Sequence, residues 1–163
     1  SRLRCGTVLI APGEIPPGAI NTVPQRYRLN YTYASGVTME VVSGPTFLRF
    51  EGTDGWVGNT GWSGPFEASD LNLLRRKYDP ATNKLWPRRP REQRDFLDSI
   101  KTGRPPMYTA EALQRLCTTL HVGAIAMELG RPVRWDPVKE EFPGDSAANA
   151  RRSRPRREDW KRA

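Results

Sequence analysis

Residues 27–41, YRLNYTYASGVTMEV, contain the clearest structural pattern of the chain. Apolar or aromatic residues alternate there with polar ones, and four of them fall on one face: Tyr27, Leu29, Tyr31 and Tyr33. Strict alternation is typical of a β-strand with one buried face. The small residues at 34–36 and the renewed alternation over 37–41 predict a turn and a second, antiparallel strand.

A second hairpin is predicted directly after the first. Residues 47–51 are rich in aromatic and branched side chains, and they lead through Gly52-Thr53-Asp54-Gly55 into Trp56 and Val57. An Asp-Gly pair favours the positive φ angles of a tight hairpin turn. The middle of the chain is therefore expected to be an antiparallel β meander.

Two helices are predicted in the second half of the chain. The first spans 91–101, with Phe96, Leu97 and Ile100 at helical spacing before Gly103. The second spans 110–129, with Thr109 as N-cap and Gly130 at the end. Its expected buried stripe comprises Leu113, Leu116, Cys117, Leu120, Ala124 and Met127.

The length and the charge distribution suggest three regions. The 163 residues are typical of one domain, and we place an α+β sheet domain at 26–140. Residues 1–25 form a proline-rich entry segment, in which four prolines predict a surface loop over 11–24. Residues 141–163 form a basic C-terminal tail. The net charge is +8, and seven basic and two acidic residues lie within 151–163.

Several classes of protein and site are excluded or disfavoured. No run of about 20 apolar residues could span a bilayer, so the chain is expected to be soluble, with no membrane partner. Cys5 and Cys117 are too few for a disulfide scaffold or a thiolate metal site, and we expect both to be reduced, packed thiols. With a single histidine, His121, no metal site is predicted.

His121 is the one candidate imidazole of the chain. It could orient a substrate hydroxyl or act as a base, but a partly buried structural histidine on the long helix is the favoured interpretation. The acidic pairs Glu140-Glu141 and Glu158-Asp159 are interpreted as solvated charges.

Nucleotide-binding and hydrolase motifs are missing from the sequence. There is no GxGxxG, no GxxxxGK[ST], and Gly61-Trp62-Ser63-Gly64 is one residue short of a nucleophile elbow. The tyrosines of 27–33 could stack bases and the arginine-rich tail could attract phosphates. Since alternate aromatics in a strand usually form a core face, nucleic acid is not the expected partner, and a small basic nucleic-acid-binding module is kept as an alternative.

Four segments in order resemble a known family. They are YTYASGVTMEV at 31–41, LRFEGTDGWV at 48–57, RDFLDSIKTGRPP at 94–106, and LHVGAIAMELGRPVRWDPVKEEFPGDSAANARRSRPRREDW at 120–160. Together they resemble the C-terminal domain of the Gfo/Idh/MocA oxidoreductases, which include glucose–fructose oxidoreductase and inositol dehydrogenases, and are most similar to a bacterial branch. The likeness covers nearly all of the chain from Arg26 onward.

The resemblance implies an α+β fold with a large, open, mainly antiparallel sheet and helices on one face. It implies that the other face serves a homo-oligomer, and that the tail docks through Trp160. In such a family NAD or NADP lies on a separate N-terminal Rossmann domain of the same polypeptide, which this chain lacks. The long helix resembles the family helix that runs toward that domain, which would leave part of its apolar stripe exposed.

The family's catalytic residues have no counterpart here. Its Glu-Lys-Pro lysine belongs to the cofactor-binding domain, and its Asp and His pair would fall upstream of Ser1; His121 does not match that position. The resemblance therefore implies a substrate-binding and oligomerisation domain of an NAD(P)-dependent oxidoreductase, present as a fragment that is inactive alone. The expected substrate is a sugar or polyol, and a non-catalytic assembly module is a further alternative. Substrate identity, the choice between NAD and NADP, and a cytoplasmic or exported location stay open.

Overall fold

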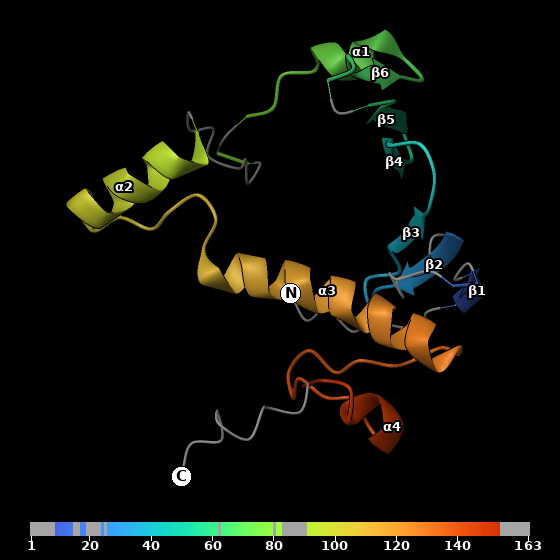
Figure 1. Ribbon diagram of the computed structural model, residues 1–163. Coiled ribbons are helices and arrows are strands. Elements are labelled where there is room, and N and C mark those ends of the chain that lie inside the picture. Colours follow the sequence, from blue (N-terminus) through green and yellow to red (C-terminus); the bar gives the residue numbers. More distant parts are fainter. Residues whose placement is uncertain are drawn as a thin grey trace. The chain divides into compact units, whose positions relative to one another are not determined.

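The computed structural model describes residues 9–14, 17–18, 24, 26–61, 63–79, 81–82 and 91–153 (Figure 1). Their contacts group into two compact units. The first unit takes in residues 1–43 and 111–163, and the second takes in residues 44–110. The predicted boundaries of the 26–140 domain do not coincide with those of the two units, and they stay a prediction.

The first unit contains a three-stranded antiparallel sheet in the order β1-β2-β3. The predicted hairpin is confirmed: β2 (Arg26–Thr32) pairs with β3 (Thr38–Val42), with Tyr31 opposite Met39. The backbone N–H of Tyr33 donates to the carbonyl of Val37 at 2.9 Å, and Gly36 takes a φ of +84° in the turn. Leu29 and Tyr31 are buried, so the alternating face is a core face and not a surface for stacking bases.

The prediction of a loop over 11–24 is wrong for residues 11–14, which belong to a strand. β1 (Leu9–Glu14) pairs antiparallel with β2, with Ala11 opposite Arg28. The register shifts between Ala11 and Glu14, where Pro12 and Gly13 lie. Proline lacks an N–H donor and is tolerated in a sheet at a bulge or an edge strand, and β1 is both irregular and at the edge.

The long helix α3 (Ala110–Leu129) has the predicted limits but a different buried face. The predicted stripe is largely exposed, including Leu116 at 57% and Leu120 at 60%. The buried residues are instead Val122, Gly123, Ile125 and Ala126. The exposed stripe agrees with the expectation that part of it would be left uncovered in this chain.

Gly123 explains why this face of α3 is the buried one. A Cβ at position 123 would lie 2.0 Å from the Tyr31 hydroxyl oxygen and 2.9 Å from Cδ1 of Leu29. The Tyr31 hydroxyl donates to the carbonyl of Thr119 at 3.3 Å. The strand can approach the helix this closely only because residue 123 has no side chain.

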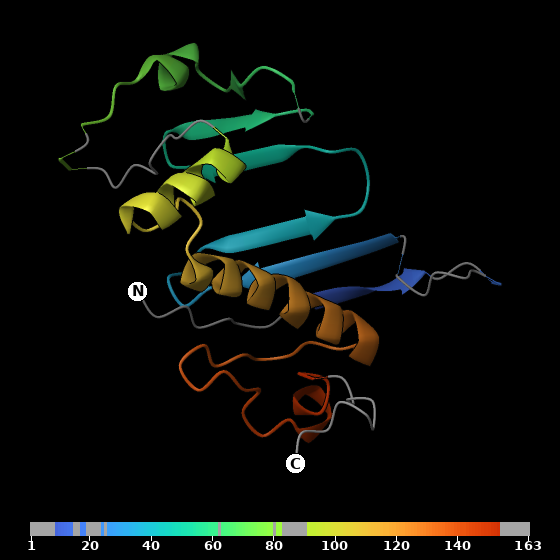
Figure 2. The same ribbon diagram turned by 60° about the vertical axis from the view of Figure 1, so that its left-hand side comes forward.

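After α3 the chain doubles back along the helix (Figures 1 and 2). Gly130, with φ of +62°, ends the helix as predicted. We call residues 131–153 the clasp. The clasp contains the short helix α4 (Ser146–Asn149), and Val133, Phe142 and Ala148 complete the core of this unit. The predicted basic tail therefore contributes core residues up to Ala148, whereas Trp160 and the arginines from Arg154 onward lie outside the described residues.

Side-chain contacts close the clasp on itself. The rings of Trp135 and Phe142 meet edge to face with centroids 4.9 Å apart. The Asn149 amide accepts from the Phe142 N–H at 3.0 Å and donates to the Phe142 carbonyl at 2.7 Å, as a paired strand would. Arg131 forms two hydrogen bonds with Asp145, at 2.6 and 2.7 Å.

The second unit contains a further antiparallel sheet in the order β4-β5-β6. The predicted hairpin is confirmed, because β4 (Leu48–Gly52) pairs with β5 (Gly55–Asn59), and Gly55 has φ of +130°. β6 (Glu67–Ala68) completes the sheet and leads into the short helix α1 (Leu71–Arg75). The guanidinium of Arg49 lies over the Trp56 ring, 4.4 Å from its centroid.

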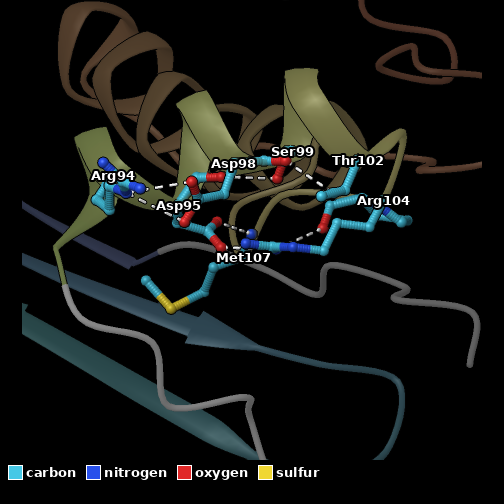
Figure 3. Close-up of polar contacts among 8 residues, drawn as sticks. Arg94, Asp95, Asp98, Ser99, Thr102, Arg104 and Met107 are labelled. Carbon is cyan, nitrogen blue, oxygen red and sulfur yellow. Dashed lines mark hydrogen bonds and ion pairs between the residues drawn. The ribbon is translucent and has the colours of Figure 1, made fainter.

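Helix α2 (Glu92–Thr102) is anchored by a buried carboxylate (Figure 3). Asp95 is 4% exposed and accepts from the Arg104 guanidinium at 2.8 Å and from the Met107 N–H at 2.6 Å. These bonds fix the segment that follows the helix. Phe96, Leu97 and Ile100, whose spacing predicted this helix, are exposed.

The α+β class with antiparallel strands is confirmed. Hydrogen bonding divides the strands into two three-stranded sheets, where one large sheet was expected. Within the described part of the chain, no helix has the length and apolarity that a bilayer crossing requires.

Candidate functional site

A hollow of about 650 Å³ opens between α3 and the clasp, entirely within the first unit. We call it the α3 hollow. Its apolar floor comprises Val122, Ala124, Ile125, Trp135 and Phe142. Its polar rim comprises Gln114, Thr118, His121, Glu128, Glu140, Arg151, Arg152 and Ser153.

The helical repeat places the rim residues of α3 together. Gln114, Thr118 and His121 are spaced by four and three residues, so they follow one another along one side of the helix. The clasp supplies the opposite side because its core residue Phe142 packs against Trp135 and positions the residues on either side of it.

Two polar contacts join the sides of the hollow. Arg151 Nε donates to Glu128 Oε1 at 2.8 Å, and its Nη1 donates to the Ala147 carbonyl at 2.9 Å. Gln114 Nε2 donates to Glu140 Oε1 at 2.9 Å. The contacts of Arg151 with Glu128 and of Gln114 with Glu140 link α3 to the clasp, so the rim is held in place before any ligand arrives.

His121, which the sequence singled out as a candidate, lies on this rim. Its side chain is exposed, so the expectation of a partly buried structural histidine is wrong. Helix α3 presents it toward the α3 hollow beside Val122, whose own side chain is buried. Its role in binding a substrate stays a prediction.

Of the other residues that the sequence singled out, only some line the hollow. Glu140 was predicted to be a solvated charge, and it is exposed, yet it lines the hollow and bonds Gln114. Glu141 pairs through its backbone with Asp136. Cys117 is exposed and not packed as expected, whereas Cys5 and the pair Glu158-Asp159 lie outside the described residues.

Sequence reasoning missed most of the rim. The rim residue Glu128 and the floor residue Trp135 were not singled out as site candidates, and Arg151 was considered only as part of the basic tail. The available signal was the helix stop at Gly130 followed by Trp135-Asp136-Pro137, which indicates that the chain turns back on the helix.

Two paired residues of the clasp, Arg131 and Asp145, have shifted pKa values. The hydrogen bonds from Arg131 and, next, from the Ala148 N–H lower the pKa of Asp145 from 3.8 to about 2. The same contact with Asp145 raises the pKa of Arg131. Both groups are held in their charged forms, so this pair is structural and is not poised to exchange protons near neutral pH.

The described residues offer neither a metal site nor a dinucleotide site. No group of three or more His, Cys, Asp or Glu side chains gathers among them. A dinucleotide needs a glycine-rich turn from a parallel strand into a helix. All four strand pairs described are antiparallel, and β6 enters α1 through Ser69-Asp70 without a glycine. NAD or NADP therefore does not fit this part of the chain.

Comparison with known proteins identifies the protein family. The model of a protein family described as "Oxidoreductase family, C-terminal alpha/beta domain", of Gfo/Idh/MocA type, matches residues 15–162. The chain belongs to this family, and the resemblance found in the sequence is confirmed at that level. Neither the curated proteins nor the solved structures include a match to this chain.

Proposed function

We propose that this chain is the substrate-binding and oligomerisation domain of a bacterial NAD(P)-dependent oxidoreductase that acts on a sugar or polyol. In this proposal an N-terminal Rossmann domain of the same polypeptide holds the cofactor, and the chain alone is inactive. The observation that carries the proposal is the family match over residues 15–162. The misfit between the described residues and a dinucleotide supports a cofactor site on another domain.

Two features of the described residues support a role in binding and assembly. The α3 hollow is within the range of about 300–1,000 Å³ that is typical of small-molecule sites. Exposed apolar side chains on α3, such as Leu116 and Leu120, offer a surface that another domain or subunit could cover.

The first test is the mass of the native polypeptide in its source cell, measured with an antibody raised against this chain. A Rossmann domain needs about 100–150 further residues, so we expect a product well above 18.5 kDa. A native product of 18.5 kDa would contradict the proposal and favour an assembly or nucleic-acid-binding role.

The second test is activity. The native polypeptide should reduce NAD or NADP in the presence of one or more members of a sugar and polyol panel, and the 163-residue chain should not. Light scattering of both proteins tests the proposed homo-oligomer. A longer native polypeptide that reduces neither cofactor with any member of the panel would refute the proposed substrate class.

A further inference from the structure

A second hollow, of about 380 Å³, lies at the turn of the clasp and within the first unit. We call it the turn hollow. The residues that line it are Arg134, Trp135, Asp136, Pro137, Val138, Lys139 and Pro143. Its volume is within the range of about 300–1,000 Å³ that is typical of small-molecule sites. Of the described residues that line the α3 hollow, only Trp135 also lines this one, so the two hollows are distinct.

Hydrogen bonds to the backbone give the turn hollow its shape. The backbone N–H of Asp136 donates to the carbonyl of Glu141 at 2.8 Å, and that of Glu141 donates to the carbonyl of Asp136 at 3.3 Å. Asp136 Oδ1 accepts from the N–H groups of Val138 and Lys139 at 2.9 and 3.2 Å. The lining side chains therefore stand on an ordered turn, which lowers the entropic cost of binding.

The charged side chains of the turn hollow favour an anion. Arg134 and Lys139 contribute two positive charges, and Asp136 contributes one negative charge. Oδ1 of Asp136 already accepts two backbone N–H groups, so this carboxylate stabilises the turn. Residues 154–163, which lie outside the described part, carry five basic and two acidic side chains, so on balance they add no negative charge. A negatively charged group would find its counter-charge here, whereas a cation would not.

Both cations have bonding capacity left. Among the described residues, the exposed guanidinium of Arg134 has no hydrogen-bond or ion-pair partner. Lys139 Nζ lies 3.9 Å from Glu141 Oε1, and the Lys139 side chain is 69% exposed. So long and exposed a pair contributes little to stability and leaves the ammonium able to bond a ligand. A guanidinium can donate two parallel N–H bonds to one carboxylate, and a neighbouring ammonium adds a third donor.

Apolar side chains form the remainder of the turn hollow. The half-buried Trp135 is held by the edge-to-face contact of its ring with Phe142, and Pro137 and Pro143 lie beside it in the lining. Val138 is the most exposed of the large apolar side chains described. A flat apolar group that covered Val138 and the indole would remove apolar surface from water.

We propose that the turn hollow binds an organic anion made of a carboxylate on a flat apolar body, such as an aromatic carboxylate. Arg134 and Lys139 bond the carboxylate, and Trp135 and Val138 contact the body. This site goes beyond the proposed function, because it uses neither the cofactor nor the substrate of an oxidoreductase. Its test on this chain therefore stands or fails independently of the tests on the native polypeptide.

The test is a titration of the ¹⁵N-labelled 163-residue chain, followed by nuclear magnetic resonance. The probes are benzoate, its neutral isostere benzamide, the cation benzylamine, and acetate, which has no ring. We expect saturable shifts with benzoate, centred on the amides of 134–139 and the Trp135 indole. Benzamide and acetate should each bind at least tenfold more weakly, because each lacks one half of the contacts, and benzylamine should bind most weakly.

Variants of the two cations test the charged half of the site. Arg134→Gln and Lys139→Gln should each weaken benzoate binding roughly tenfold, since each loses a hydrogen bond between charged groups, and should leave benzamide binding nearly unchanged. Arg152→Gln is the matched control. Arg152 is exposed and, within the described part of the chain, also lacks a polar partner, but it lines the α3 hollow and not the turn hollow. This control should bind benzoate like the parent chain.

A further variant tests the apolar half. Val138→Ser should weaken benzoate and benzamide alike, by about threefold, because apolar contact with the ring is lost. Val37→Ser, at a residue that is 60% exposed in the turn between β2 and β3, is its control and should bind normally. Circular dichroism should show that all five variants fold.

Several outcomes would overturn the proposal. One is the lack of saturable shifts with benzoate up to its solubility limit, and another is a set of shifts centred outside 134–143. Benzamide, acetate or benzylamine binding as tightly as benzoate would refute the stated ligand chemistry. Normal benzoate binding by the Arg134 and Lys139 variants, or equal weakening by the Arg152 control, would refute the assignment of the two cations.

Discussion

Replacing Gly123 by alanine tests whether the approach of β2 to α3 determines which face of the helix is buried. The added methyl would meet the Tyr31 hydroxyl oxygen at 2.0 Å and Leu29 Cδ1 at 2.9 Å. Both side chains are at least 96% buried, so neither can move into solvent. Overpacking of this kind costs about 1–3 kcal/mol, and the severity of the overlap points to the upper end.

The helix itself would gain from the change, which sets the expected net effect. Alanine is favoured over glycine within a helix by about 1 kcal/mol. An overlap cost of about 3 kcal/mol less this gain gives a net loss of about 2 kcal/mol in the free energy of unfolding. Urea denaturation followed by circular dichroism, together with hydrogen exchange of α3 amides, measures this loss in the first unit.

A double mutant separates the overlap from other effects. Tyr31→Phe removes the hydroxyl and should cost about 1 kcal/mol through the lost bond to Thr119. In combination with Gly123→Ala it also removes the closest overlap, so the double mutant should be more stable than the two separate losses predict. Ala124→Gly, at the exposed neighbouring position, should cost about 1 kcal/mol by helix propensity and show no coupling to Tyr31. Additive losses for Gly123 and Tyr31, or a Gly123→Ala chain at least as stable as the parent, would refute the reasoning.

Three further predictions concern single side chains. Asp145→Asn should lower the melting temperature at neutral pH; because the pKa of Asp145 is lowered from 3.8 to about 2, the difference from the parent should persist above pH 4 and disappear as the pH falls toward 2. A difference that is independent of pH would contradict this assignment. Asp95→Ala removes the acceptor of the Met107 N–H and should cost roughly 3 kcal/mol, with faster hydrogen exchange at Met107; unchanged exchange would show that the anchor is not needed. In a Cys5→Ser chain, Cys117 should react with a thiol reagent without denaturant, and protection of this thiol would show that α3 is covered there.

Local patterns in the sequence were enough to predict the elements with strong periodicity. Both hairpins and the limits of α3 follow from alternation, turn residues and the stop at Gly130. β1 was missed because Pro12 argues against a strand, and the bulge that accommodates it depends on pairing with β2, which a local pattern does not contain. A tertiary contact thus outweighed a local preference.

The buried face of α3 could not be predicted from periodicity for a related reason. The helix has one stripe of large apolar residues and another that includes Gly123 and Ala126, and a hydrophobic pattern favours the first. Close approach of a strand selects the second, because small residues let the Tyr31 ring reach the helix backbone. The rim of the α3 hollow was missed as well, since its members come together only when the clasp folds back.

Many of the residues that carry the family resemblance build the core and the clasp, which explains how far the resemblance reaches. In the segment from Trp135 to Asn149, Phe142 is core, Asp145 caps α4 and bonds Arg131, and Asn149 holds the Phe142 backbone. These contacts build the clasp, so a match to them indicates the fold and the oxidoreductase class. Of these three residues only Phe142 lines the α3 hollow, as part of its apolar floor, so these contacts do not indicate which ligand is chosen. Exposed rim residues such as His121, which lies within the resembling segment 120–160, are outside the core and could change without disturbing it, so the family match leaves the ligand of the hollow open.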